Sequence, residues 1–436
     1  MTTKQLKHLK PFQRIGVEFL KNNYHALLAD EMGLGKTVQA LIAFKELKLK
    51  SGLIICPASV RLNWRREISD WGLDNRMFDV ISYNGASSHV IRRELRKRYD
   101  MCILDEVHYL KTPESKRTKS VFGNKAGLAR RCTRIMGLSG TPILNRPREL
   151  FVILKCLATE RIKPYDHYER FMYRYCGAFF DGYRVNDRGH SNLEELKGRL
   201  TGFMLRRTKS SVLKELPAKS IKHVPLERDA KDFRELDLME MEMEIADREA
   251  FISSAKEGYA QLGDLARLRR ATGMAKVPAM IKYIKDLLET VDKVVVFTWH
   301  RDVLSQLVGA LDIDCDNMAV TYQGGYSDLR KQGALKSFID HKKCKVFIGN
   351  IQAAGTGIDG LQKVCSNVVF AEMSWVPGEM NQAMDRIYRM GQTNPVTVHI
   401  PYVEGTLESA MIGVHKGKEA VIEQVVGNSE VLGDFL

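Results

Sequence analysis

The sequence predicts an α/β protein with two parallel sheets and a helical segment between them. Short apolar runs alternate with amphipathic stretches from residue 25 to 142, and the same alternation returns from about residue 278. Such alternation favours parallel strands that are connected by helices. Between Pro225 and Pro278 there is no proline and the charge is dense, which favours long helices over a sheet.

Apolar runs in each half of the chain are the predicted strands. Those of the first half are HALLA (25–29), GLIICP (52–57), FDVISY (78–83), MCILDE (101–106) and RIMGLS (134–139). Those of the second half are KVVVFTW (293–299), NMAVTY (317–322), CKVFIGN (344–350), NVVFAE (367–372) and VTVHIPYV (396–403). The predicted domains are a first lobe at 1–205 with a helical extension from about 145, a basic connector at 206–225, a helical insertion at 226–277 and a second lobe at 278–436.

The composition is that of an ordinary globular protein with a polyanionic partner. The 436 residues suffice for two or three domains, and the net charge of +14 favours nucleic acid first and an anionic membrane second. No apolar stretch approaches the length of a membrane span, and the first residues lack the apolar core of a signal peptide. The eight cysteines stand singly without a CxxC pair, which favours buried thiols and a reduced, cytosolic setting.

A glycine-rich segment, LADEMGLGKT (28–37), follows the first predicted strand and leads into a predicted helix. Its core residues are Gly33, Leu34, Gly35, Lys36 and Thr37. Glycines let backbone N–H groups close on a polyphosphate, and the helix N-terminus favours its negative charge. In such a loop the lysine reaches the β- and γ-phosphates and the threonine hydroxyl binds Mg²⁺. The strict pattern begins with glycine where this chain has Asp30.

Two acidic residues, Asp105 and Glu106, end the apolar run MCILDEVH. One carboxylate can hold the water shell of a metal ion, and the other can orient an attacking water molecule. Together with the phosphate loop, this pair predicts hydrolysis of a nucleoside triphosphate.

Two arginines in NQAMDRIYRMGQ (381–392) are candidates to complete that site. Arg386 and Arg389 are three residues apart in a helix-like run, so they are expected to share one helical face. An arginine at the γ-phosphate accelerates phosphoryl transfer by roughly 10³- to 10⁵-fold. A solvated basic face is the usual fate of paired arginines, but a phosphate loop in a separate lobe favours the catalytic interpretation.

Seven segments resemble the motifs of the Swi/Snf-type ATPases of helicase superfamily 2, in the same order and at similar spacing. They are LKPFQRIGVEFL, LADEMGLGKT, LIICPASVRLNW, LDEVH, GLSGTPILN, QAAGTGIDGL and WVPGEMNQAMDRIYRMGQ. The resemblance covers residues 6 to 408, and RIYRMGQT is most similar to the annealing-helicase branch. It implies two RecA-like lobes with ATP between them and double-stranded DNA across both.

The resemblance also implies roles for single residues. It implies that Gln13 recognises the adenine and that Lys36 and the surrounding loop bind the phosphates. It also implies that Asp105 binds the metal ion and that Glu106 activates the attacking water. The residues that complete the ATP site from the second lobe are then Gln382, Arg386 and Arg389. An acidic residue at the position of Asp30 is usual in this family.

Several further residues are candidate DNA contacts. The resemblance implies that Ser139 and Thr141 couple hydrolysis to DNA, and that Trp375 lies against DNA. Arg61 and Asn63 begin a predicted helix and can reach phosphates, and Thr356 is a candidate in the second lobe. The chain departs from the family pattern at Gln352 and Asp359, where relatives carry a basic residue and asparagine, so one cationic DNA contact is expected to be absent.

These observations favour an ATP- and Mg²⁺-dependent translocase on double-stranded or branched DNA, with remodelling or annealing as its outcome. The alternative is a nucleotide-gated DNA scaffold with little turnover inside a larger assembly. An RNA helicase is less favoured, because glycine is absent between the arginines of DRIYRMGQ. The chain is expected to be a monomer open to a protein partner, and cytoplasmic in a bacterium or a virus-infected cell or nuclear in a eukaryote.

Overall fold

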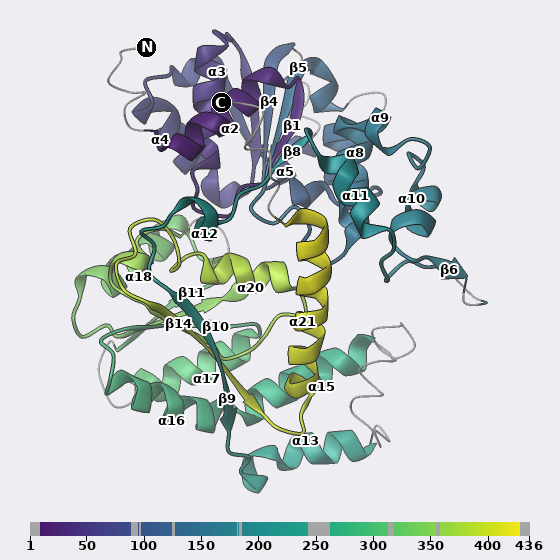
Figure 1. The fold of residues 1–436 in the computed structure, drawn as a ribbon. Helices are drawn as coiled ribbons and strands as arrows, with labels where there is room; N and C mark the ends of the chain where they lie inside the picture. The colour runs from purple at the N-terminus through teal and green to yellow at the C-terminus, as the bar shows by residue number, and fades with distance from the viewer. Residues whose placement is uncertain are drawn as a thin grey trace. The chain divides into compact units, whose positions relative to one another are not determined.

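The computed structural model describes residues 9–88, 95, 97–123, 127–180, 182, 185–242, 262–312, 318–354 and 358–427. Two compact units make up the chain, and Figure 1 traces both. Unit 1 comprises Met1–Lys214 and Ala420–Leu436, and unit 2 comprises Glu215–Glu419. Each unit contains one six-stranded sheet in which all paired strands are parallel.

The sheet of unit 1 has the strand order β3-β2-β4-β5-β1-β8. Its strands are β1 (His25–Leu28), β2 (Gly52–Cys56), β3 (Phe78–Ser82), β4 (Tyr99–Asp105), β5 (Cys132–Leu138) and β8 (Met204–Leu205). Leu28 pairs with Leu138, which pairs with Asp105 on its other side. Because these strands are parallel and end in one row, the segments that follow them emerge side by side.

Apolar residues of unit 1 pack on both faces of its sheet. One face carries α2 (Pro11–Asn22), α3 (Lys36–Glu46) and α4 (Arg61–Asp70). Alternate strand residues such as Leu27 and Leu104 face the other core, as expected when successive side chains point to opposite faces. That core includes residues of α5 (Tyr83–Ala86), α7 (Lys116–Phe122), α8 (Leu150–Leu157), α9 (Thr159–Ile162), α10 (Tyr168–Tyr175) and α11 (Leu193–Leu200).

Shorter elements complete unit 1. They are α12 (Lys209–Val212), the antiparallel pair β6 (Phe179–Phe180) and β7 (Val185–Asn186), and the 3-10 turns η1 (Ala58–Val60), η2 (Asn75–Met77), η3 (Val107–Leu110), η4 (Leu128–Arg131) and η5 (Pro147–Glu149). The helices α8 to α11 lie in the predicted helical extension from about 145, and the β6–β7 pair within it was not predicted.

The sheet of unit 2 has the strand order β11-β12-β10-β13-β14-β9. Its strands are β9 (Lys219–Leu226), β10 (Val294–Thr298), β11 (Ala319–Tyr322), β12 (Val346–Asn350), β13 (Asn367–Phe370) and β14 (Val396–Val403). The helical elements are α13 (Ala230–Glu242), α15 (Leu262–Ala275), α16 (Val277–Leu288), α17 (Arg301–Asp312), α18 (Asp328–Asp340), α19 (Ile351–Ala354), η6 (Leu361–Lys363), α20 (Pro377–Met384) and α21 (Leu407–Val426), the last of which passes into unit 1 at Ala420.

The predicted fold class is confirmed, and each of the ten predicted strands is present. The strand β9 was not predicted, because it lies in the stretch interpreted as a basic connector. It forms the edge of the sheet, and its first residues are exposed, so its sequence lacks the apolar signal of a buried strand. The cysteines of the described ranges are free thiols, and no helix there is both long and apolar enough to cross a membrane.

Candidate nucleotide site

The phosphate loop follows β1 and ends at the first residue of α3. Gly33 and Gly35 both have left-handed backbones, with φ of 85° and 77°. A side chain at Gly35 would place its Cβ 2.4 Å from Gln13 Nε2, so both the backbone and the packing require glycine there. Lys36 Nζ donates to the carbonyl oxygen of Asp30 at 2.7 Å, which holds the lysine within the loop, and Thr37 lies in the first turn of α3.

Gln13 on α2 lies directly beside this loop. Its side-chain Nε2 donates to the carbonyl oxygen of Leu34 at 3.2 Å, and its Oε1 accepts from the backbone N–H of Lys10 at 3.0 Å. The structure therefore brings together Gln13 and the phosphate loop, which are far apart in the sequence.

Asp30, the departure from the strict loop pattern, is fully buried and paired with Arg207. Arg207 Nε donates to Asp30 Oδ1 at 2.8 Å, and its Nη2 donates to Asp30 Oδ2. Gln39 on α3 completes the group, since its Nε2 donates to Asp30 Oδ2 at 3.1 Å. Asp30 thus links the start of the phosphate loop to Arg207, which belongs to a segment of unit 1 that is distant in the sequence.

The residues after β8 form a support for the loop that the sequence interpretation missed. Arg206 Nη1 donates to the carbonyl oxygens of Ala29 and Gly140, both at 3.1 Å. The backbone N–H of Lys209 donates to Glu31 Oε2 at 2.6 Å. The sequence analysis assigned these basic residues to a connector. The apolar pair Met204–Leu205 just before them, which is buried, was a signal that this part of the chain packs into the core of unit 1.

Asp105 ends β4, close to the phosphate loop, and is anchored by two aromatic residues. Trp64 Nε1 donates to Asp105 Oδ2 at 2.8 Å, and the Tyr83 hydroxyl donates to the Asp105 carbonyl oxygen at 2.8 Å. Burial, followed by the charge of Glu106, raises the pKa of the Asp105 carboxyl, while Trp64 and Lys36 oppose the shift. Trp64 is itself buried in the core of unit 1 and positions this acid through its indole N–H.

Glu106 has a left-handed backbone with φ of 50°, which is uncommon for a residue with a side chain and typical of functional sites. Ser139 Oγ, which follows β5, donates to Glu106 Oε2 at 3.4 Å and lies 2.9 Å from His108 Nδ1. Burial, followed by the charge of Lys111, lowers the pKa of His108 to about 3, so its 3.3 Å approach to Glu106 involves a neutral imidazole.

The backbone N–H of Thr141 extends this group by donating to Ser139 Oγ at 3.2 Å. A Cβ on Gly140 would lie 3.3 Å from Lys36 Nζ, which shows how closely this turn approaches the phosphate loop. A chain of contacts therefore leads from Glu106 through Ser139 to Thr141, next to Lys36.

The residues present fit a magnesium ion held jointly with phosphates. Asp105 is a partly buried carboxylate whose ionised form is disfavoured by desolvation, and a cation there would stabilise that form. Thr37 supplies a hydroxyl at the start of α3. In the described ranges there is no group of three or more His, Cys, Asp and Glu residues that could hold a metal ion.

The two arginines of unit 2 do not lie in a helix, contrary to expectation. The helix α20 ends at Met384, and Arg386 and Arg389 follow it in turns. Gln392 explains the change, because its Nε2 donates to the carbonyl oxygens of Cys365 and Ile387 and draws the segment out of helical geometry.

Both arginines point to one loop of unit 2. Arg386 Nη1 donates to the carbonyl oxygen of Ile358 at 3.5 Å, and Arg389 Nη1 lies 3.3 Å from Asp359 Oδ1. Gln382 is buried in α20. Asp359, the unusual acid of this chain, therefore pairs with one of the two candidate catalytic arginines.

The candidate DNA contacts lie in both units. Arg61 and Asn63 are exposed at the start of α4, and Asn63 Oδ1 accepts from Arg66 at 2.7 Å. Trp375 is half-buried against the core of unit 2, and its carbonyl oxygen accepts from Lys418 Nζ at 2.7 Å. Thr356 lies outside the described residues.

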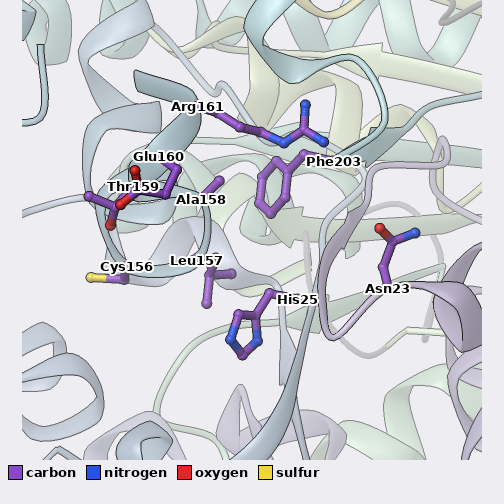
Figure 2. Close-up of a pocket in the computed structure, with 9 residues that line it drawn as sticks. All are labelled: Asn23, His25, Cys156, Leu157, Ala158, Thr159, Glu160, Arg161 and Phe203. Carbon is purple, nitrogen blue, oxygen red and sulfur yellow. The ribbon is translucent and has the colours of Figure 1, made fainter. Parts of the chain in front are cut away.

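A separate cavity of about 390 Å³ lies at the amino ends of the unit 1 strands, opposite the ends that the phosphate loop follows. His25, the first residue of β1, lines it, whereas the phosphate loop follows the last residue of that strand. Figure 2 shows the lining residues, which include Arg161 and Phe203. Because of this placement the cavity is not the nucleotide site.

A phosphate loop after β1, an acidic pair at the end of β4 and a second parallel α/β unit define the fold of a two-lobed P-loop NTPase. The SNF2-related domain family matches residues 12–100 and 80–234, and the helicase conserved C-terminal domain family matches residues 275–391. The chain belongs to the SNF2-related family of helicase-like ATPases, which confirms the resemblance found in the sequence.

Its relatives include proteins with more than twice its length. The chain is 31% identical to the "DNA annealing helicase and endonuclease ZRANB3" of Homo sapiens, with 95% of the chain and 40% of that protein covered. It is 32% identical to the "SWI/SNF-related matrix-associated actin-dependent regulator of chromatin subfamily A-like protein 1" of Xenopus tropicalis, with 96% and 45% covered. The chain thus spans less than half the length of these curated relatives.

Among solved structures, the chain is similar to the "Sulfolobus solfataricus SWI2/SNF2 ATPase core in complex with dsDNA". The match covers 97% of both chains at 22% identity and a TM-score of 0.43.

Proposed function

We propose that this protein is a DNA-dependent ATPase that moves along double-stranded DNA and remodels branched DNA. The observation that carries the proposal is the chain of contacts from Glu106 through Ser139 to the backbone of Thr141. Such a chain gives DNA bound near Thr141 a physical route to the residue that orients the attacking water. Relatives described as an annealing helicase favour branched DNA and strand annealing as the finer role.

Each residue of the site then has a definite task. The backbone of Gly33, Leu34 and Gly35 and the Lys36 ammonium bind the phosphates of ATP, and Gln13 binds the adenine. Glu106 orients the attacking water. When bound, Mg²⁺ at Thr37 and Asp105 supplies positive charge to the phosphate oxygens.

Unit 2 contributes the remaining groups of the reaction. Arg386 and Arg389 stabilise the charge of the transferred phosphoryl group, and Gln382 supports them from α20. Arg61, Asn63, Ser139, Thr141, Thr356 and Trp375 are the proposed DNA contacts. Because phosphate contacts dominate such binding, affinity for duplex DNA falls steeply with salt. A monomer, a protein partner and a cytoplasmic or nuclear location stay predictions.

The test is steady-state phosphate release from ATP with no nucleic acid, with duplex DNA, with forked DNA and with single-stranded RNA. We expect stimulation by duplex and forked DNA, and a loss of more than about hundredfold in Glu106→Gln. The matched control is Glu114→Gln, because Glu114 is an exposed acid of unit 1 whose partner is Lys119.

Two other outcomes would decide against the proposal. DNA binding that depends on nucleotide, without phosphate release, would establish the alternative of a gated scaffold. Stimulation by single-stranded RNA alone would establish an RNA-directed enzyme of the same superfamily.

A further inference from the structure

The β6–β7 pair exposes an unusual amount of aromatic surface. Phe179 and Phe180, the two residues of β6, are 53% and 63% exposed, and Val185 opposite Phe180 is 47% exposed. Successive strand residues point to opposite faces. Because both phenylalanines are more than half exposed, each face of the pair leaves aromatic surface accessible. Figure 1 shows β6 at the outer end of the helical extension, beyond α10.

The base of this hairpin is held firmly. Arg148 Nη1 lies 2.8 Å from Asp187 Oδ1, and the Tyr168 hydroxyl donates to Asp187 Oδ2 at 3.2 Å. The backbone N–H of Gly177 donates to Ser191 Oγ at 3.0 Å. The exposed rings are therefore presented from a fixed base, which reduces the conformational entropy lost when they bind a partner.

Positive charge is concentrated at the same base. Burial is the largest influence that lowers the pKa of Arg146. The positive charges of Arg148 and Arg188 lower it further, so these two arginines lie near Arg146. The carboxylate of Asp187 is the acidic neighbour within this group, whereas that of Glu149 is engaged by Lys111 at 2.7 Å. This group of three arginines thus includes one that is paired with Asp187, the residue directly after β7.

We propose that this surface binds unpaired nucleotides where duplex DNA passes into a single strand. The hairpin patch, defined as Phe179, Phe180 and Val185 with Arg146, Arg148 and Arg188, offers rings on which bases stack and cations for the phosphates. The bases of a duplex are already stacked on each other, so the rings distinguish unpaired from paired DNA. The chain enters the patch five residues after Thr141, a proposed DNA contact.

This inference rests on the proposed function and names the part of a branched substrate that unit 1 recognises. A protein partner would also bury aromatic rings, but the excess of arginine over carboxylate beside them favours a polyanion. The patch is separate from the phosphate loop and from the acidic pair, so its removal is expected to affect substrate choice and not the chemistry of hydrolysis.

The test compares the full chain with a Phe179→Ser, Phe180→Ser double variant. Affinities are measured by fluorescence anisotropy for a blunt duplex and for the same duplex with a single-stranded tail carrying 2-aminopurine. We expect the double variant to lose about tenfold in affinity for the tailed duplex, with far less change for the blunt one. The quenching of 2-aminopurine that a stacked ring causes should also be lost.

Two further variants make the result specific. Phe179→Tyr with Phe180→Tyr keeps both rings and should restore tail binding and quenching. Tyr24→Ser is the matched control, because Tyr24 is a 62% exposed aromatic residue of unit 1 outside the patch. Thermal melting of each variant shows whether it is folded.

Tail affinity and quenching that are equal in the wild type and in the double serine variant would overturn the inference, and would assign the patch to a protein partner. Phosphate release stimulated by blunt duplex tests the proposed function separately. Absence of stimulation together with ring-dependent tail binding would refute the ATPase motor and leave the patch standing.

Discussion

Arg207 and Asp30 form a buried, bidentate ion pair that fixes the start of the phosphate loop. Arg207 Nε lies 2.8 Å from Asp30 Oδ1, and Asp30 is completely buried. Gln39 bonds to both partners, since its Oε1 also accepts from Arg207 Nη2 at 3.0 Å. The pair joins two segments of unit 1 that are separated by most of its sequence, so the shape of the nucleotide site depends on a residue far outside the loop.

Removal of one partner of this pair is expected to be costly. Arg207→Met leaves the Asp30 carboxylate buried without its cation, and such changes destabilise a fold by about 3–5 kcal/mol. The double variant Arg207→Met, Asp30→Asn removes the uncompensated charge and should recover part of that loss. Urea denaturation and the binding of a fluorescent ATP analogue measure both effects.

The matched control for this prediction is Arg76→Met, which breaks an exposed ion pair with Asp74 in the same unit. No measurable change in the urea midpoint is expected there, because exposed pairs contribute little. If Arg207→Met were as harmless as Arg76→Met, the buried pair would have no structural role.

Ser139→Ala should separate ATP hydrolysis from its stimulation by DNA. The Ser139 hydroxyl joins the Glu106 carboxylate to the backbone of Thr141, so its loss interrupts the contact chain without removing the catalytic acid. We expect the DNA-stimulated rate to fall at least about threefold, while the rate without DNA and the KM for ATP change little.

Ser120→Ala is the control for that variant, because Ser120 is also buried in unit 1 and its hydroxyl donates to a helix carbonyl, that of Lys116. An equal fall with and without DNA in Ser139→Ala would mean that the serine supports Glu106 alone and carries no signal from DNA.

The sequence sufficed for ten of the twelve strands in the two sheets and for the residues at their carboxyl ends, and it failed where function depends on tertiary contacts. Local glycines and apolar runs identify the loop at Lys36 and the acid at Asp105, because both are properties of one strand and the turn after it. Arg207 and Trp64 act across long sequence separations, and nothing in their own neighbourhoods shows what they contact.

The same reason explains the incorrect helix at Arg386 and Arg389. Helical spacing continues through the segment, but the side-chain amide of Gln392 bonds to the carbonyl oxygen of Cys365, which belongs to another part of unit 2. A tertiary hydrogen bond therefore overrides the local preference. The exposed edge strand β9 was missed for the opposite reason, since it has few buried contacts to leave an apolar pattern.

Asp359→Asn is expected to strengthen the interaction of unit 2 with polyanions. Asp359 Oδ1 lies 3.3 Å from Arg389 Nη1 and offsets part of its positive charge. The resemblance found in the sequence implies asparagine at this position in the family. The neutral side chain should raise the affinity for duplex DNA up to about fivefold and steepen its dependence on salt. Asp340→Asn, at an exposed acid at the end of α18, is the control for a simple change in net charge. Weaker DNA binding in Asp359→Asn would show that the acid positions Arg389 productively.

Two buried histidines of unit 2 predict a loss of stability in mild acid. Tyr283 Oη lies 2.6 Å from His399 Nδ1, and Asn367 Oδ1 lies 3.3 Å from its Nε2, an environment that suits the neutral ring. Burial, followed by the charge of Lys222, lowers the pKa of His399 to about 4. Burial also lowers the pKa of His415 to about 4. The hydrogen bond to the Ser374 carbonyl oxygen acts in the other direction and raises this pKa, but by less than burial lowers it.

The direction follows from proton binding. In the unfolded chain a histidine titrates near 6.5, so below that pH the unfolded state binds protons that the folded state does not. The free energy of unfolding should therefore fall as the pH drops from about 6.5 to about 4, by up to about 3 kcal/mol for each histidine, and the contribution of these groups should level off below that range. Urea midpoints between pH 7 and about 4.5 measure this slope. His399→Gln should reduce it, with His341→Gln as the exposed control, and a His399→Gln variant as sensitive to acid as the wild type would contradict the assignment.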